Sequence, residues 1–184
     1  MASLAKRKQN MKISILGYSG AGKSTLARTL GNHHGIDVLH LDSVQFLPGW
    51  VVRGKDEKQN LVSEFLDTHD SWVIDGNYSK LSYDRRMESA DLIVLLLFNR
   101  VNCLFRAYRR YRTFKGTTRP DMGEGCNEKF DKEFVKWILW EGRNKAARSR
   151  YKSLISMYKY KTVVIRNQRQ LNRFVDSLEK DILP

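Results

Sequence analysis

One short segment near the N-terminus combines glycines, a lysine and a serine at a spacing suited to phosphate binding. Residues 17–24 read Gly-Tyr-Ser-Gly-Ala-Gly-Lys-Ser and satisfy the pattern GxxxxGK[ST] in full. The glycines allow the backbone N–H groups to point inward, the lysine brings a positive charge to the terminal phosphates, and the serine offers a hydroxyl to Mg²⁺. We predict the binding of a nucleoside triphosphate, with Lys23 also catalytic, through Gly17, Tyr18, Ser19, Gly20, Ala21, Gly22, Lys23, Ser24 and Thr25.

Two aspartates follow predicted apolar strands. Asp42 comes after residues 37–41, and Asp75 comes after residues 71–74. Ligands of open α/β sheets bind beyond the carboxyl ends of the strands. We predict that Asp75 and Ser24 hold Mg²⁺, and that Asp42 orients or deprotonates an acceptor hydroxyl. The alternative for each aspartate is a helix cap or a loop acid.

Two further polar residues lie at the same predicted edge of the sheet. Asn77 and Tyr78 directly follow Asp75-Gly76 and can donate hydrogen bonds, so they join Asp42 as candidate substrate-binding residues. Because Asn and Gly also favour turns, ordinary turn chemistry is an equal alternative.

An arginine-rich stretch interrupts the chain after the fourth predicted strand. Residues 100–152 hold fifteen Lys and Arg against six Asp and Glu, so they carry +9 of the total +13. A spacing of three puts Arg106 and Arg109 on one helical face, with Arg110 beside them. Positioned arginines stabilise the charge that develops in phosphoryl transfer. These three are therefore candidate catalytic residues, and Arg119 is a candidate substrate-binding residue.

Two other interpretations of this basic stretch stay open. It is either a solvated face without a partner, or a nucleic-acid surface on which interleaved aromatic residues stack against bases. Those aromatic residues are Tyr108, Tyr111 and Phe114, although aromatic residues at helical spacing more often belong to a core.

The elements that must position these residues follow a regular β-then-α order. Five apolar segments are predicted strands, and their nearly continuous apolar character indicates a parallel sheet buried on both faces. They span residues 12–16, 37–41, 71–74, 91–98 and 162–165. Predicted helices span residues 23–33, 56–69, 128–147 and 168–182, with Asn127 and Asn167 as N-caps. Trp137 and Trp140 are assigned to core or hinge packing. The pattern predicts a three-layer α/β/α fold in one domain spanning residues 1–184.

Residues 101–147 are too long for a simple crossover between strands and are interpreted as a helical lid-like insertion. Lids of this kind close over bound phosphates and exclude water. An ordinary helical hairpin that never moves is the alternative.

Composition limits the class of protein. With 184 residues, 41% hydrophobic and 29% charged, the chain suits one globular α/β domain rather than a disordered segment. No apolar run approaches the roughly 18 residues needed to span a bilayer, so no membrane partner is expected. The two cysteines, Cys103 and Cys126, form no framework, and a reducing cytoplasm is the expected location. The net charge of +13 favours anionic partners such as nucleotides or nucleic acid.

Several longer motifs resemble the bacterial DNA topology modulation proteins, which are P-loop kinase-like proteins related to adenylate and shikimate kinases. The resemblance runs from about Met11 to about Leu178 and is carried by residues 40–42, 46–50, 71–78, 118–122, 124–126 and 134–140. It implies a nucleotide-kinase-like P-loop NTPase fold with strand order 2-3-1-4-5, and it implies ATP and Mg²⁺. Asp75-Gly76 then matches the pair that holds magnesium, and Asp42 matches the acid that faces the acceptor hydroxyl. Residues 77–79 depart from the Phe-Pro-Arg of nucleoside monophosphate kinases, which weighs against a nucleotide acceptor.

Together these features predict an ATP-dependent kinase that transfers the γ-phosphate to a small-molecule hydroxyl or phosphate acceptor. The alternative is a nucleotide-gated DNA-binding or topology-modulating regulatory protein without useful phosphotransfer. A monomer or a homodimer is expected.

Overall fold

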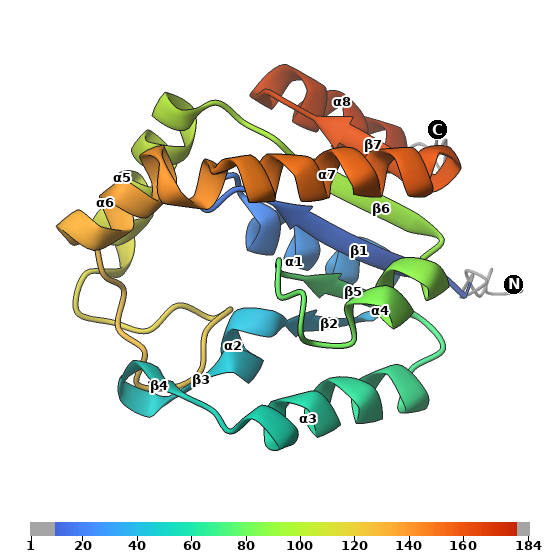
Figure 1. Cartoon of the computed structure of the whole chain (residues 1–184), viewed down its shortest axis with the longest axis horizontal. Helices are drawn as coiled ribbons and strands as arrows, with labels where there is room; N and C mark the ends of the chain where they lie inside the picture. Colours follow the sequence, from blue (N-terminus) through green and yellow to red (C-terminus); the bar gives the residue numbers. More distant parts are fainter. Residues whose placement is uncertain (1–9, 180–184) are drawn as a thin grey trace, which may run out of the picture.

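The computed structural model describes residues 10–179, apart from the side chains of residues 178 and 179. A five-stranded parallel sheet lies at the centre (Figure 1). Its strands are β1 (Lys12–Gly17), β2 (Asp37–His40), β5 (Trp72–Asp75), β6 (Leu92–Leu96) and β7 (Thr162–Ile165).

The strand order in this sheet is β2-β5-β1-β6-β7. Two short strands precede β5 in the chain but form a separate hairpin, which is why the labels differ from the predicted order 2-3-1-4-5. When only the five strands of the large sheet are counted, the order agrees with the prediction. The central strand β1 pairs with β5 on one side and β6 on the other, so its carboxyl end opens at the middle of the sheet.

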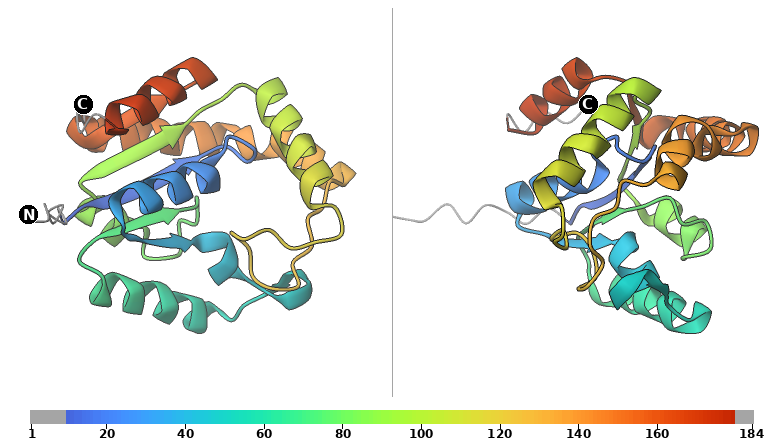
Figure 2. Two further views of the ribbon diagram at one scale, coloured as in Figure 1. Left: turned by 180° about the vertical axis from the view of Figure 1, so that it is seen from behind. Right: turned by 90° about the vertical axis from the view of Figure 1, so that its left-hand side faces the viewer.

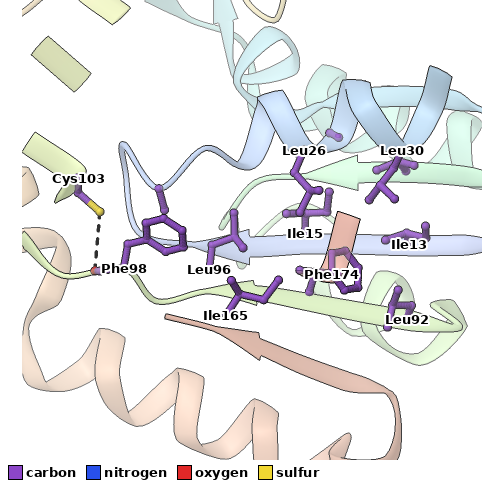
Figure 3. Close-up of a cluster of buried hydrophobic side chains, with 14 of the residues drawn as sticks. Ile13, Ile15, Leu26, Leu30, Leu92, Leu96, Phe98, Cys103, Ile165 and Phe174 are labelled. Atoms are coloured by element: carbon purple, nitrogen blue, oxygen red, sulfur yellow. Dashed lines mark hydrogen bonds between the residues drawn. The ribbon is translucent and has the colours of Figure 1, made fainter. Parts of the chain in front are cut away.

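Helices cover both faces of the sheet and complete three layers (Figures 1 and 2). One apolar cluster contains side chains of α1, α5 and α8, and the other contains side chains of α3, α4 and α7. Alternate residues of β1 serve the two clusters, Ile15 the first and Leu16 the second, which explains the continuous apolar runs. Figure 3 shows the first cluster, where Leu26 and Phe174 lie over Ile13 and Ile15. These helices are α1 (Lys23–His34), α3 (Lys55–Thr68), α4 (Tyr83–Ser89), α5 (Arg100–Phe114), α7 (Lys145–Met157) and α8 (Gln168–Glu179).

A small hairpin that was not predicted follows β2. The chain passes through α2 (Leu41–Gln45), β3 (Phe46–Leu47), a short 3-10 turn η1 (Pro48–Trp50) and β4 (Val51–Val52). The insertion packs on it: Gly49 N donates to Gly125 O at 3.1 Å, and Trp50 Nε1 donates to Asn127 O at 3.0 Å. Figure 1 shows the insertion, coloured yellow, running from α5 to this hairpin.

The predicted helix over residues 128–147 is wrong. The structure has α6 (Lys132–Leu139), a 3-10 turn η2 (Glu141–Arg143) and then α7. Asp131, rather than the predicted Asn127, caps α6, and Asn144 caps α7, so two local start signals divide the segment. The predicted cap at Asn167 is confirmed, since its side chain accepts from Gln170 N at 3.0 Å. The end of the predicted last helix, residues 180–182, lies outside the described residues.

Of the two roles assigned to Trp137 and Trp140, core or hinge packing, the structure contradicts the core. Trp137 is 49% exposed and Trp140 is 58% exposed, while Ile138 between them is the buried residue of α6. Phe134 and Ile138 are the residues of α6 that pack against the core, and both indoles are partly exposed. Within residues 10–179, no helix has the length and apolar character needed to cross a membrane.

Candidate active site

The predicted phosphate-binding segment forms a tight loop between β1 and α1. Gly17, Gly20 and Gly22 all have positive φ, at 138°, 78° and 96°. A Cβ at Gly17 would lie 2.2 Å from Leu96 O, and one at Gly20 would lie 2.3 Å from Cys103 O. Glycine is therefore required at both positions by backbone conformation and by space. This fixed loop, opening onto the N-terminus of α1, is the cradle that the pattern predicts.

Two basic side chains hold the loop from inside the site. Lys23 Nζ donates to Tyr18 O at 3.4 Å, so the lysine spans the loop. Arg106 donates to Ala21 O at 2.9 Å and also bonds Gln168 Oε1 at the start of α8. Its guanidinium lies over the Phe98 ring, 4.5 Å from the centroid, and burial lowers its pKa. Arg106 thus reaches the loop as predicted, and in this conformation it bonds loop backbone.

Ser24 and Asp75 meet, as the prediction for a magnesium site requires. Ser24 Oγ donates to Asp75 Oδ2 at 2.9 Å, and Asp75 is the buried last residue of β5. The other carboxylate oxygen, Oδ1, bonds His40 Nδ1 at the end of β2. Because three segments supply these groups, the carboxylate is held in one orientation beside the phosphate loop.

Asp42 lies in the first turn of α2, two residues after β2 ends. Tyr78 Oη donates to Asp42 Oδ1 at 2.6 Å. Burial, together with the charge and hydrogen bond of Asp42, raises the pKa of Tyr78, so the phenol stays protonated and remains a donor. This bond holds Asp42 through Oδ1 and leaves Oδ2 outside it. Tyr78 therefore orients Asp42 in the cleft that both residues line.

Asn77 is bonded to the phosphate loop. Gly17 N donates to Asn77 Oδ1 at 3.0 Å, and Asn77 Nδ2 donates to Gly17 O at 2.6 Å. These bonds give Asn77 the structural role in the turn that was the alternative to substrate binding, and the residue also lines the cleft. This two-way bond joins the turn after β5 to the first residue of the loop.

Arg86, a residue that the sequence prediction missed, donates hydrogen bonds to the backbone of that turn. Its fully buried guanidinium donates to Leu81 O at 2.8 Å, Tyr78 O at 2.7 Å and Gly76 O at 3.5 Å. Burial lowers the pKa of Arg86 to about 10, which leaves it charged at neutral pH. The turn that carries Asn77 and Tyr78 is thus tied to α4.

Four charged side chains of the insertion form a series of linked ion pairs beside the phosphate loop. Glu128 accepts from Arg110 Nε at 2.8 Å and pairs with Arg119 Nε at 2.5 Å. Arg119 also donates to Asp121 Oδ2 at 2.7 Å. The structure therefore commits the predicted phosphate-facing Arg110 and substrate-binding Arg119 to carboxylates of the insertion. Arg109 is exposed, lines the cleft and has no ion pair within residues 10–179.

Asp121 links this chain of charges to the phosphate loop. Burial alone would raise the pKa of Asp121, but Arg119, the neighbouring Ser24 hydroxyl, and the charges of His40 and Arg28 outweigh burial and lower it. Arg28 of α1 lies 4.0 Å from the carboxylate, which is only 5% exposed. An ionised carboxylate of the insertion therefore lies next to Ser24.

A second contact joins α6 to the phosphate loop. Trp137 Nε1 donates to Ser19 Oγ at 3.1 Å. The partly exposed indole thereby forms one wall beside the loop, together with the side of α5 that carries Arg106.

Most of the predicted site residues line one cleft of about 1710 Å³. Eleven basic and five acidic side chains line it, so the cleft is strongly cationic. Of the predicted site residues, Ser19, Gly20, Gly22, Lys23, Ser24, Thr25, Asp42, Asn77, Tyr78, Arg106, Arg109, Arg110 and Arg119 line the cleft, and Asp75 lies beneath it.

Besides Arg86, the sequence analysis missed three charged or titratable residues that contact the predicted site residues: His40, Asp121 and Glu128. Each had only a weak local signal, since His40 precedes Asp42 by two residues and the two acids lie in a stretch noted for arginines. Their importance comes from contacts between distant segments, which spacing alone does not reveal.

The residues present fit a magnesium ion bound together with a nucleotide. Within the described part of the chain, no group of three or more His, Cys, Asp or Glu side chains is arranged to hold a metal by itself. A hydroxyl and a buried carboxylate at a phosphate loop instead suit an ion that retains waters and phosphate ligands. Ser24 and Asp75 would hold it, directly or through water.

Comparison with known proteins establishes the fold. No protein-family model and no curated protein sequence matches the chain. Shikimate kinase from Acinetobacter baumannii in complex with shikimate is similar, with a TM-score of 0.54 and 15% identity over 94% of this chain and 92% of that one. Shikimate kinase from Bacteroides thetaiotaomicron gives 0.49 and 16% over 94% and 98%. An uncharacterized protein from Eubacterium ventriosum ATCC 27560 gives 0.48 and 13%, also over 94% and 98%. The chain has the α/β P-loop kinase fold.

Proposed function

We propose that this protein is an ATP-dependent kinase that transfers the γ-phosphate to a hydroxyl, or to a phosphate, of a small molecule. The observation that carries the proposal is the convergence of Lys23, the Ser24–Asp75 pair and the Asp42–Tyr78 pair on one cleft. A fold analogy of 15% identity does not identify a substrate, so the argument rests on the site itself.

Each group has a defined role in this proposal. The loop amides and Lys23 bind the triphosphate, and Asp75 and Ser24 hold Mg²⁺, which when bound neutralises charge on the phosphate oxygens. Asp42 accepts the proton of the acceptor hydroxyl through the oxygen that Tyr78 leaves available. Arg109 and Arg106 lie along the same cleft and are the candidates for stabilising the transferring group.

The insertion, residues 101–147, acts in this proposal as a lid that excludes water from the cleft. Its contacts with the hairpin cover the cleft from α5 to η1. Exclusion of water matters because it keeps the phosphoryl group from hydrolysis. The resemblance to DNA topology modulation proteins is compatible with this assignment but adds no mechanism.

The proposal is tested by ATP consumption over a panel of hydroxyl- and phosphate-bearing metabolites. Acceptor-dependent ADP release is expected, with Asp42→Asn lowering kcat by about 100-fold or more while Mg·ATP binding persists. Lys23→Met should weaken both binding and turnover. A protein that binds Mg·ATP, transfers nothing across a broad panel and binds duplex DNA with a steep salt dependence would instead be the regulatory alternative.

A further inference from the structure

The cleft contains several positive side chains that belong neither to the phosphate loop nor to the insertion. Four cations line it away from the loop: Lys55 and Lys58 of α3, Lys80 after Tyr78, and Arg150 of α7. Within residues 10–179, none of the four forms an ion pair with a carboxylate. Asp56, next to Lys55 on α3, also lines the cleft, and together with Asp42 it leaves the four cations in excess. An anionic ligand relieves the remaining repulsion.

Two of these cations are linked to the Asp42–Tyr78 pair through neighbouring residues. Lys58 Nζ donates to Gln45 Oε1 at 3.1 Å, and Gln45 lies three residues after Asp42 on α2, on the same helical face. Lys80 lies two residues beyond Tyr78 in the turn after β5, and both lysines line the cleft together with the pair.

The other two cations extend this region. Lys55 is the first residue of α3, where the helix dipole disfavours a positive charge, so its placement is not explained by helix stability. Arg150 is exposed on α7 and close enough to Tyr83 to lower the pKa of that phenol, against the larger raising effect of burial. Since Tyr83 begins α4 shortly after Lys80, Arg150 faces the same end of the cleft.

Two aromatic rings line the same cleft. The Phe46 and Trp50 rings meet edge to face at 5.2 Å, and the insertion holds Trp50 through Asn127 O. Trp50 has a φ of 66°, a costly conformation for a residue with a bulky side chain. A strained, restrained ring beside a cationic region suits a ligand with a carbon skeleton and a charged end.

We propose that the acceptor is an alcohol that already carries a phosphate group, with the hydroxyl at Asp42 and the phosphate among Lys55, Lys58, Lys80 and Arg150. This inference rests on the proposed kinase function. A phosphate monoester has three terminal oxygens and a charge near −2, which matches several converging cations better than a monoanion does.

The test measures phosphate binding without knowledge of the acceptor. The full-length protein is saturated with Mg²⁺ and a non-hydrolysable ATP analogue, which fills the phosphate loop, and inorganic phosphate or acetate is then titrated by calorimetry. We expect saturable phosphate binding at millimolar or lower concentration, at least tenfold tighter than acetate binding. Lys58→Gln and Lys80→Gln should each weaken phosphate binding about fivefold or more.

Two neighbouring arginines provide a matched control. Arg148 and Arg150 are both exposed on α7, but only Arg150 lines the cleft. Arg150→Gln should weaken phosphate binding, whereas Arg148→Gln should leave it unchanged. An equal loss in both variants, no saturable phosphate binding, or preference for acetate would overturn the proposal. If the analogue itself fails to bind, the proposed kinase function fails instead, so the two failures are distinguishable.

Turnover provides an independent readout. Matched pairs such as glycerol and glycerol 3-phosphate, or ribose and ribose 5-phosphate, are assayed for ADP release. The phosphorylated member of a productive pair should have a kcat/KM at least tenfold higher, and Lys58→Gln should raise its KM more than it lowers kcat. Equal turnover of the two members would contradict the inference while leaving the kinase proposal intact.

Discussion

The phosphate loop and the insertion meet in one cleft but are held by different forces. Close backbone packing and hydrogen bonds to its backbone position the loop: Gly17 packs against Leu96, Asn77 bonds Gly17 in both directions, and Lys23 and Arg106 donate to loop carbonyl oxygens. The insertion is fixed by a buried chain of ions through Arg110, Glu128, Arg119 and Asp121. The loop is therefore rigid through shape, whereas the insertion depends on charges that are each costly to leave unpaired.

This difference bears on motion. An apolar or backbone contact weakens gradually, but a buried ion chain tends to be either complete or broken, which gives a segment two distinct states. We expect residues 115–131 of the insertion to open as a unit while the phosphate loop keeps its shape.

The largest effect should come from adding one methyl group to the phosphate loop. Gly17→Ala introduces a Cβ 2.2 Å from Leu96 O at a φ of 138°. Overpacking and strain together should cost about 3 kcal/mol or more of unfolding free energy. At Gly116 of the insertion, φ is 77° and nothing lies within 4 Å, so Gly116→Ala should cost only about 1 kcal/mol. Denaturant unfolding measures both, and equal losses would contradict the proposed contrast.

Breaking the ion chain should affect the insertion alone. Glu128→Gln leaves Arg110 and Arg119 buried beside a neutral amide, which should cost roughly 3 kcal/mol in the local opening free energy. Hydrogen exchange should accelerate over residues 115–131 and stay unchanged in the phosphate loop. Glu141→Gln, which removes an exposed partner of Lys136, is the control and should change neither region. Equal acceleration in both regions would mean that they open together.

The two buried cysteines report on the two regions separately. Cys103 lies in α5, at the start of the insertion, where its backbone packs against Gly20 of the phosphate loop. Cys126 lies between α5 and α6, where its thiol contacts Leu47 O at 3.2 Å. Burial raises the pKa of Cys103, so its folded-state thiol is unreactive. In single-cysteine variants, alkylation of Cys126 should be about tenfold faster, reflecting local opening, and Mg·ATP should slow it. Equal rates would show that only global unfolding exposes either thiol.

The smallest effect concerns the contact that joins the two regions. Trp137→Phe removes the hydrogen bond to Ser19 from a partly exposed site, which should cost about 1 kcal/mol. The KM for ATP should rise by a few-fold without loss of fold, as measured by steady-state kinetics and thermal unfolding. A change above about tenfold would assign the indole a direct role in nucleotide binding.

The fold was largely predictable because its signals are local. Continuous apolar runs identified all five strands of the sheet, and the glycine spacing identified the loop before Lys23. The hairpin at residues 46–52 was missed because its strands are two residues long. The helix over 128–147 was wrong because apolar spacing continued past Asn144, although that residue begins a new helix.

The site was predictable in its residues but not in its pairings. Ser24 was identified from the phosphate-loop pattern, and Asp75 and Asp42 from their places at strand ends. In the structure Ser24 and Asp42 line one cleft, and Asp75 lies beneath it, bonded to Ser24. The partners of Asn77 and Arg119 were not foreseen, since Gly17 and Glu128 lie 60 and 9 residues away and no local pattern links them.

The carbonyl oxygens of the turn after β5 accept hydrogen bonds from a buried side chain. Arg86 supplies the donors for three of its carbonyl oxygens from inside the protein, and it comes from α4, which contributes no other contact of this kind to the turn among the described residues. The turn therefore acquires its shape only when α4 is docked. Substitutions on the buried side of α4, such as at Met87, should consequently shift the turn and change the alignment of nucleotide and acceptor. This helix would then affect the geometry of the reaction without contacting either ligand.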